Sequence, residues 1–155
     1  MRNRLIVTCL ILAFTASAAL GAEIKPSKKD KCPVCGMLVY MYPDWAAKIE
    51  FKDGTTSFFD GPKDMLRYYL DLAKYAKGHA EGDIREMLVT EYYDLTPVDA
   101  KTAWFVTGSD VMGPMGAELV PFKTEAQAAD FKRDHKGKAI LKFTEITAKV
   151  MKGFE

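Results

Sequence analysis

The chain has 155 residues, a formal net charge of +1 at neutral pH and 48% hydrophobic residues. This apolar content supports a folded core and excludes a chain that is disordered throughout. The near-neutral charge gives no reason to expect nucleic-acid binding, which normally requires a basic patch.

Residues 1–22 have the three parts of a secretory signal peptide: a short cationic start, an apolar run and a stretch of small residues. The apolar run is short for a membrane span, which needs about 20 residues. We expect cleavage after Gly21 or Ala22, or alternatively after Ala18. An uncleaved N-terminal anchor is the competing interpretation. Cys9 would leave with the signal, and no cysteine follows the run to form a lipobox. We therefore expect a periplasmic protein without stable membrane insertion.

After a polar, flexible lead-in at residues 23–31, residues 32–98 are predicted to form a first ββαβ-like unit. Alternating apolar residues in 45–51 predict a half-buried strand, and Asp53-Gly54 predicts a hairpin turn. Asp60 is the expected N-cap of a helix that ends near Gly78. The remaining expectations for this unit are strands at 38–42, 55–59 and 87–95, and a charged loop at 79–86.

Residues 99–148 are predicted to form a second unit of the same kind, followed by a loose tail at 149–155. Thr124 is the expected cap of its helix. Each half has a methionine next to a glycine and a phenylalanine just before a capped helix. We therefore predict an α+β fold of two ββαβ-like units related by internal duplication, with mainly antiparallel strands. The segments expected in this half are strands at 103–107, 118–122 and 138–146, a glycine-containing loop at 108–116, and a helix ending near Lys136.

The segment Cys32-Pro33-Val34-Cys35-Gly36-Met37 places two thiols and a thioether within six residues. Thiolate and thioether sulfurs are soft ligands, which select Cu(I). A structural disulfide is an alternative in an exported protein, and so is a redox-active pair. A redox pair of the thioredoxin kind precedes a helix, whereas this motif leads into an expected strand. A zinc site would need about four ligands, and the sequence does not place His79 or His135 near the motif.

Two methionines are candidates to complete a sulfur site. Met37 lies two residues from Cys35, so both side chains point the same way along an extended backbone. Met115 lies in a loop rich in glycine and proline, where core packing explains a thioether poorly. If the two halves pack about a pseudo-twofold axis, this loop meets the cysteine loop. The candidate site is then Cys35, Met37 and Met115, and Cys32 is a further thiolate or a disulfide partner.

The other candidate residues have simpler interpretations. Met112 is a spare ligand candidate, whereas Met41, Met65, Met87 and Met151 are read as core or incidental. His79 and His135 are interpreted as surface residues, although either remains open as a further ligand. Asp60 and Asp64 are assigned to the start of the helix rather than to acid–base chemistry. No recognisable catalytic set is present, so we expect a binding protein rather than an enzyme.

The sequence resembles the NosL family, the nitrous oxide reductase accessory proteins. The likeness covers roughly residues 31–147. Its most specific parts are the Cys-Gly-Met motif at 35–37 and the Gly-Pro-Met-Gly motif at 113–116. The resemblance implies a fold of two ββαβ units and a distant likeness to part of organomercurial lyase.

The resemblance also implies a function. It indicates a periplasmic Cu(I)-binding metallochaperone that helps deliver copper to nitrous oxide reductase beside a membrane transporter assembly. The family's sulfur ligands map to Cys35 and Met37, with Met115 as the third. The chain departs from the family pattern in lacking a lipobox and in having Cys32. The alternatives are copper handling for another cuproenzyme, a thiol–disulfide redox protein that uses Cys32 and Cys35, and a binding module with a structural disulfide.

Overall fold

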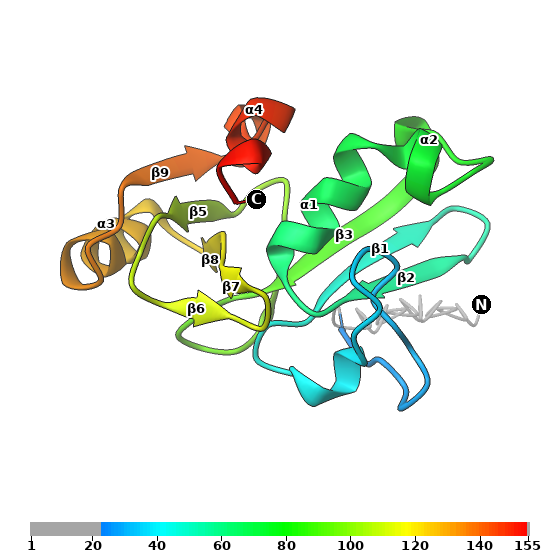
Figure 1. Ribbon diagram of the computed structural model, residues 1–155, viewed down its shortest axis with the longest axis horizontal. Coiled ribbons are helices and arrows are strands. Elements are labelled where there is room, and N and C mark those ends of the chain that lie inside the picture. The colour runs from blue at the N-terminus through cyan, green and yellow to red at the C-terminus, as the bar shows by residue number, and fades with distance from the viewer. Residues whose placement is uncertain (1–22, 155) are drawn as a thin grey trace, which may run out of the picture.

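The structure is a computed structural model that describes residues 23–154, so the expected signal peptide lies outside the described residues. It has an α+β architecture with mainly antiparallel strands, as the sequence predicts. Two sheets lie side by side, each with its own helix (Figure 1). No helix in the described part of the chain is long and apolar enough to cross a bilayer.

The first sheet has four antiparallel strands in the order β2-β1-β3-β4. The predicted turn at Asp53-Gly54 joins β1 to β2, with Gly54 at a positive φ of 88° that glycine adopts readily. Helix α1 packs against β1 and β2. The bounds are β1 Ala47–Phe51, β2 Thr56–Phe59, α1 Pro62–Leu70, β3 Ile84–Thr90 and β4 Pro97–Asp99.

The second sheet has three antiparallel strands in the order β8-β5-β9. Helix α3 packs on it, and the Thr124 hydroxyl accepts a bond from the Gln127 amide at 3.2 Å, as the predicted cap requires. The bounds are β5 Trp104–Thr107, β8 Val120–Phe122, α3 Glu125–Asp134 and β9 Ala139–Lys142. In both sheets the first strand lies between the second strand and the strand after the helix. This shared topology agrees with two ββαβ-like units, whereas internal duplication stays a prediction.

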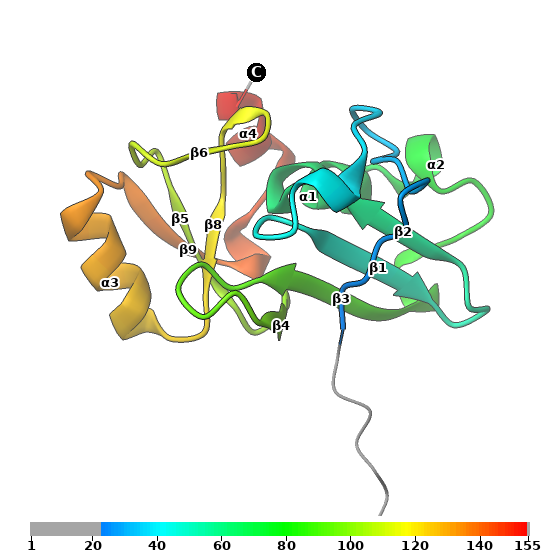
Figure 2. The ribbon, with the colours of Figure 1, turned by 90° about the horizontal axis from the view of Figure 1, so that it is seen from below.

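The expected glycine-containing loop at 108–116 contains a small hairpin. Its strands are β6 (Met112–Gly113) and β7 (Gly116–Ala117), and Pro114 and Met115 form the turn. The hairpin leaves the second sheet and reaches the N-terminal end of α1 (Figures 1 and 2). It therefore brings one of the predicted methionine ligands towards the first half of the chain.

Two predictions near the first sheet are wrong. The strand expected at 38–42 is a 3-10 helix, η1 (Val39–Met41), and only Leu38 forms a bridge, with Lys31. The helix expected to continue to Gly78 is interrupted at Asp71, whose φ of −140° and ψ of 59° lie outside the helical region. The Asp71 side chain caps a separate short helix, α2 (Leu72–Tyr75), by accepting a bond from the Lys74 amide.

Other boundaries also shift. The charged loop expected at 79–86 contains the 3-10 helix η2 (Glu81–Asp83) and the beginning of β3, which ends at Thr90 instead of at residue 95. The strand expected at 138–146 ends at Lys142, and the 3-10 helix η3 (Phe143–Glu145) follows it. The expected loose tail forms α4 (Ala148–Met151) and η4 (Lys152–Phe154), and Met151 is buried.

The larger core lies between α1 and the first sheet and extends into the second half. Met65 and Met87 belong to it, as predicted, and so do Phe105, Leu119 and Met151. A smaller core around Phe122 and Phe131 fills the space between the second sheet and α3. The two halves are therefore joined by apolar packing as well as by the polar contact described next.

Glu118 is a buried carboxyl group at the junction of the two halves. One oxygen accepts bonds from the backbone amides of Lys63, at 2.6 Å, and Leu119, at 3.0 Å. The other oxygen lies against Gly61 and Gly113, where an added Cβ would stand 2.4 Å and 3.0 Å away. Burial raises the pKa of Glu118 to about 8, because removal from water disfavours the charged form.

We predict that Glu118 makes stability fall as pH rises from about 4.5 to about 8. The folded protein holds a proton at Glu118 in this window, whereas the unfolded chain has released it, so raising the pH favours unfolding. Glu118→Gln keeps the side-chain shape but does not titrate. In the wild type, the unfolding free energy measured by urea denaturation should fall by up to about 1.4 kcal/mol per pH unit because of Glu118. This contribution should be absent from the variant. Glu125→Gln, at an exposed position on α3, is the control. Equal slopes in Glu118→Gln and in the wild type would contradict the prediction.

Candidate metal centre

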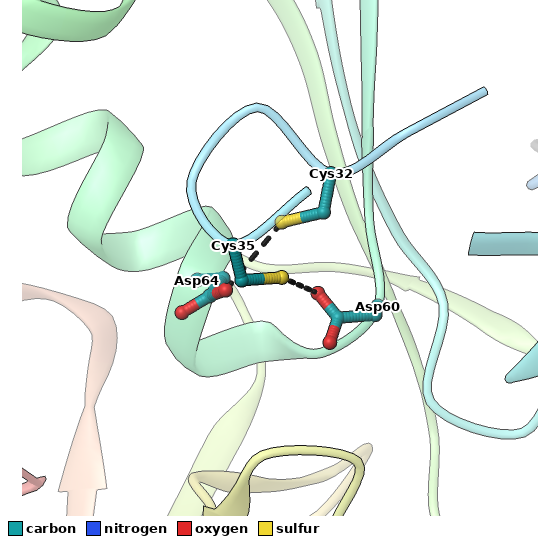
Figure 3. Close-up of side chains that lie close together, drawn as sticks. All are labelled: Cys32, Cys35, Asp60 and Asp64. Atoms are coloured by element: carbon teal, nitrogen blue, oxygen red, sulfur yellow. Dashed lines mark hydrogen bonds between the residues drawn. The ribbon is translucent and has the colours of Figure 1, made fainter. Parts of the chain in front are cut away.

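The cysteine motif forms a closed loop at the start of the described chain. The Cys32 amide donates to the Met37 carbonyl at 2.9 Å, and the Gly36 amide donates to the Cys32 carbonyl at 2.8 Å. Gly36 has a positive φ of 81°, a conformation that costs little only for glycine. The loop turns back on itself, so both cysteine side chains reach the same side of the first helix (Figure 3).

Two aspartates face these cysteines. The Cys35 thiol donates to Asp60 at 3.1 Å, and the Cys32 thiol donates to Asp64 at 3.4 Å (Figure 3). Asp60 follows β2 directly, and Asp64 lies in the first turn of α1. The predicted capping role of Asp60 is wrong: the N-cap of α1 is Gly61, which makes no side-chain cap bond.

The four ligand atoms lie within 4.8 Å of one another, and this is the one such group of three or more potential ligands among residues 23–154. Cys32, Asp60 and Asp64 are at most 2% exposed, whereas Cys35 is only partly buried. Both cysteines are free thiols. The cluster is therefore a buried polar centre whose most accessible residue is Cys35.

Burial sets the protonation of the thiols. It raises the pKa of Cys32 to about 12, and it also raises the pKa of Cys35. For both cysteines a smaller rise comes from Asp60, because a carboxylate that accepts the S–H bond favours the protonated thiol. The ligand-free protein thus has two protonated thiols at neutral pH, and a metal ion that binds them must displace protons.

The Met115 turn is held against the same end of α1. The Lys63 side chain, which is itself buried, donates to the carbonyls of Met115 and Ala117, both at 2.8 Å. Lys63 immediately precedes Asp64, so the helix turn that faces the cysteines also anchors the hairpin. The Met115 side chain remains 48% exposed. Met112 and Met41 are each 58% exposed.

The structure thus brings together some of the predicted site residues and not others. Cys32 and Cys35 form one cluster, with Met37 partly exposed at the end of their loop. Met115 is linked to the helix beside that cluster through its backbone carbonyl, which accepts from Lys63. His79 pairs with Asp53, and His135 pairs with Asp110; neither histidine is part of the cluster.

Sequence reasoning missed four residues: Asp60, Lys63, Asp64 and Glu118. The i, i+4 spacing of Asp60 and Asp64 was a usable signal, because it is compatible with two carboxylates at one end of a helix. Nothing in the sequence shows that this end faces the cysteine loop. Lys63 and Glu118 carry no local signal, since charged residues of this kind are usually exposed.

The comparisons with known proteins decide the family. The NosL family model matches residues 23–151. The chain belongs to the NosL family. It is 30% identical over 120 residues to the copper-binding lipoprotein NosL of Stutzerimonas stutzeri; the alignment covers 76% of this chain and 62% of the relative. The crystal structure of the copper chaperone NosL from Shewanella denitrificans matches with a TM-score of 0.68 and 25% identity, over 83% of this chain and 98% of that one.

These comparisons confirm the predicted family and the α+β fold. The chain spans 62% of the length of the curated relative that it matches. The two relatives are described as a copper-binding lipoprotein and a copper chaperone. The ligand set in this chain stays a prediction.

We predict that Cys32 and Cys35 of the reduced protein react slowly with iodoacetamide at neutral pH, because only the thiolate is nucleophilic. Asp60→Ala removes a carboxylate that favours the protonated thiols, so the pH midpoint of Cys35 alkylation should fall. A change in thiol ionisation shifts the pH midpoint of alkylation. A change in the access of iodoacetamide to the thiol alters the maximum rate at high pH instead. Asp130→Ala, at an exposed position on α3, is the control and should leave the midpoint in place. An unchanged midpoint in Asp60→Ala would exclude this role for the carboxylate.

Proposed function

We propose that this protein is a periplasmic metallochaperone that binds Cu(I) through Cys35, Met37 and Met115. The observation that carries the proposal is that the start of α1 contacts both the cysteine loop and the Met115 turn. Asp60 and Asp64 hold the cysteine loop on one side of it, and Lys63 holds the Met115 turn on the other. The cysteine sulfurs and the backbone of Met115, from distant parts of the chain, are thus both held at the start of α1.

The exposure of these groups suits the binding of a transferable ion. Cys35 and Met37 are partly exposed, and Met115 is about half exposed. A Cu(I) ion held by few protein sulfurs leaves room for a ligand from another protein, and soft ligands favour this ion over harder ones. Transfer would then be a ligand exchange at the surface. The proposed role is binding and delivery rather than catalysis.

Loading with copper requires that Cys35 lose its proton. The thiol already donates to Asp60 at 3.1 Å, so this carboxylate is placed to accept the proton as the sulfur binds the metal. The Cys32 thiol lies deeper and is 1% exposed. We assign Cys32 to the copper site as an additional sulfur that lies deeper than Cys35.

The thiol–disulfide alternative receives less support. A redox-active cysteine pair depends on an attacking thiol with a lowered pKa. In this protein burial, with a smaller contribution from Asp60, raises the pKa of both thiols. The protonated pair is a poor nucleophile at neutral pH, whereas a tightly binding metal ion can displace the protons.

The recipient that we propose is nitrous oxide reductase or the membrane assembly that matures it. The support is family membership, together with relatives described as a copper-binding lipoprotein and a copper chaperone. Copper delivery to another cuproenzyme is the competing proposal. The periplasmic location rests on the signal-like residues 1–22 and on the lipoprotein description of one relative.

We predict that Cu(I) affinity, measured by anaerobic competition with a chromophoric chelator, depends on the three sulfurs. Cys35→Ser should weaken binding by about 100-fold or more, and Met37→Leu and Met115→Leu by about 10-fold each. Met41→Leu is the matched control, because Met41 is also exposed but lies outside the proposed site. Wild-type affinity in both Cys35→Ser and Met115→Leu would exclude the site.

We predict that this chain restores the copper content and activity of nitrous oxide reductase in a denitrifying bacterium that lacks its own NosL protein. The Cys35→Ser variant, produced at the same level, should not restore them. Copper content of the purified reductase is the direct readout. If wild-type protein binds Cu(I) but the reductase remains copper-free, the chain serves a different recipient.

A further inference from the structure

A pocket with aromatic walls lies where the turn between β3 and β4 meets the segment before β1. The turn reaches the second sheet, where the Tyr92 amide donates to the Pro121 carbonyl of β8 at 3.1 Å (Figure 2). The cavity volume of about 420 Å³ lies within the usual range of ligand sites, about 300–1,000 Å³. This aromatic pocket shares no residue with the proposed copper site. It is lined by Asp44, Trp45, Tyr92, Tyr93, Leu95 and Val111.

Three aromatic rings form the walls of the aromatic pocket. The ring centroids of Trp45 and Tyr92 are 6.4 Å apart at an interplanar angle of 56°, and those of Tyr92 and Tyr93 are 5.3 Å apart at 73°. Tyr92 also packs edge-on against Phe131 at 4.8 Å, and Tyr93 lies 5.6 Å from Phe122. Because these core rings hold the walls in place, little ordering is needed when a ligand binds.

The chain does not fill this aromatic pocket with a cation of its own. Among residues 23–154, the cation–π contacts involve the rings of Tyr75 and Trp104 only. The Lys142 ammonium group lies 3.4 Å from the centroid of Trp104, so that tryptophan already has an internal cation. Trp45 is partly exposed and has no such contact within the described part of the chain. The pocket rings therefore remain available to a cation from outside.

The surroundings of the aromatic pocket are acidic. Asp44 lines it and has no ion-pair partner among residues 23–154. Burial raises the pKa of the Tyr93 hydroxyl, and the charges of Asp134 and Asp130 raise it further, because negative neighbours disfavour the phenolate. Arg133 pairs with both of these aspartates, so Asp44 is the carboxylate left for a ligand. A positively charged occupant is therefore favoured over a neutral or negative one.

A buried carboxyl group at the base of the turn adds to this preference. Glu91 is fully buried, and one of its oxygens accepts from the amides of Tyr93 and Asp94 at 3.0 Å and 2.6 Å. The other oxygen, Oε1, has no hydrogen-bond partner within the described residues. Burying a carboxylate is costly unless its charge is offset. A cation held by the adjacent Tyr92 and Tyr93 would offset part of that cost.

We propose that the aromatic pocket binds the quaternary ammonium group of a choline-like cation. Aromatic rings attract such a group, which has no N–H to donate and keeps its charge spread over methyl groups. Leu95 and Val111 supply apolar surface for these methyl groups, whereas a primary ammonium is strongly hydrated. Leu95 has a φ of 54°, an uncommon conformation for leucine, and its side chain is nevertheless 51% exposed. Its place at the edge of the pocket accounts for a leucine that does not enter the core.

The test is a titration of the reduced protein with choline chloride, followed in proton–nitrogen NMR correlation spectra. We expect the indole signal of Trp45 to shift until the site is saturated, while that of Trp104 stays in place. Sodium chloride at the same concentration controls for ionic strength. The neutral isostere of choline, in which carbon replaces the ammonium nitrogen, should bind about 5-fold more weakly or worse. Equal binding of the two compounds would overturn the recognition of a cation.

Variants of the pocket locate the site. Tyr93→Leu should weaken choline binding about 5-fold, and Asp44→Asn should weaken it about 2–5-fold at low ionic strength, a difference that high salt removes. Tyr40→Leu is the matched control, because Tyr40 is an exposed tyrosine outside the pocket. The remaining signals of each spectrum show whether a variant is folded. Wild-type choline affinity in folded Tyr93→Leu and Asp44→Asn proteins would overturn the proposal.

The quaternary ammonium group occurs both in free solutes and in the headgroup of phosphatidylcholine, and a second measurement distinguishes these sources. Sedimentation with phosphatidylcholine vesicles is compared with sedimentation with phosphatidylglycerol vesicles, which lack the group. Selective binding to phosphatidylcholine that Tyr93→Leu abolishes, without a shift by free choline, assigns the lipid headgroup as the ligand. Neither a choline-induced shift nor selective vesicle binding would overturn the proposal. Neither result depends on copper, so both are independent of the proposed function.

Discussion

The contact between Glu118 and the start of α1 is the constraint on which the relation of the two halves depends. Glu118 fills the space beside Gly61 and Gly113 and accepts from the Lys63 amide. The ammonium group of Lys63 in turn donates hydrogen bonds to two carbonyls of the Met115 hairpin. The two bonds from the Lys63 ammonium group involve a charged donor and contribute about 1.5–3 kcal/mol each, so this reciprocal contact holds the hairpin against the start of α1.

The same helix turn organises the chemistry. Lys63 points to the hairpin, and the adjacent Asp64 accepts from Cys32 on the cysteine side. A side chain at position 61 would displace the Glu118 carboxyl group from its place, and Pro62 begins the helix with a favourable backbone angle. The short segment from Asp60 to Asp64 thus combines helix initiation, contact between the halves and contact with the thiols. Its sequence satisfies all three requirements at once.

The sequence predicted the features that depend on local patterns. Strand alternation, the Asp53-Gly54 turn and the Thr124 cap identify most elements of both sheets, and the cysteine motif marks the centre. The role of Asp60 was not predictable, because an aspartate before Gly-Pro at a helix start is normally a cap. Its thiol partner lies 25 residues away. Residues 38–42 have the composition of a strand, but the chain curls into η1, and Val39 enters the core instead of pairing in a sheet.

The two cysteines of the centre are free thiols that differ in burial. Cys32 is enclosed with Asp64, whereas Cys35 is partly exposed. Both sulfurs are protonated until an ion arrives, so their raised pKa values limit oxidation and alkylation, which require thiolate. Each bound ion must then displace a proton, so apparent metal affinity rises with pH. Asp60 and Asp64 accept hydrogen bonds from the two thiols, so they are placed to accept the protons that the thiols lose.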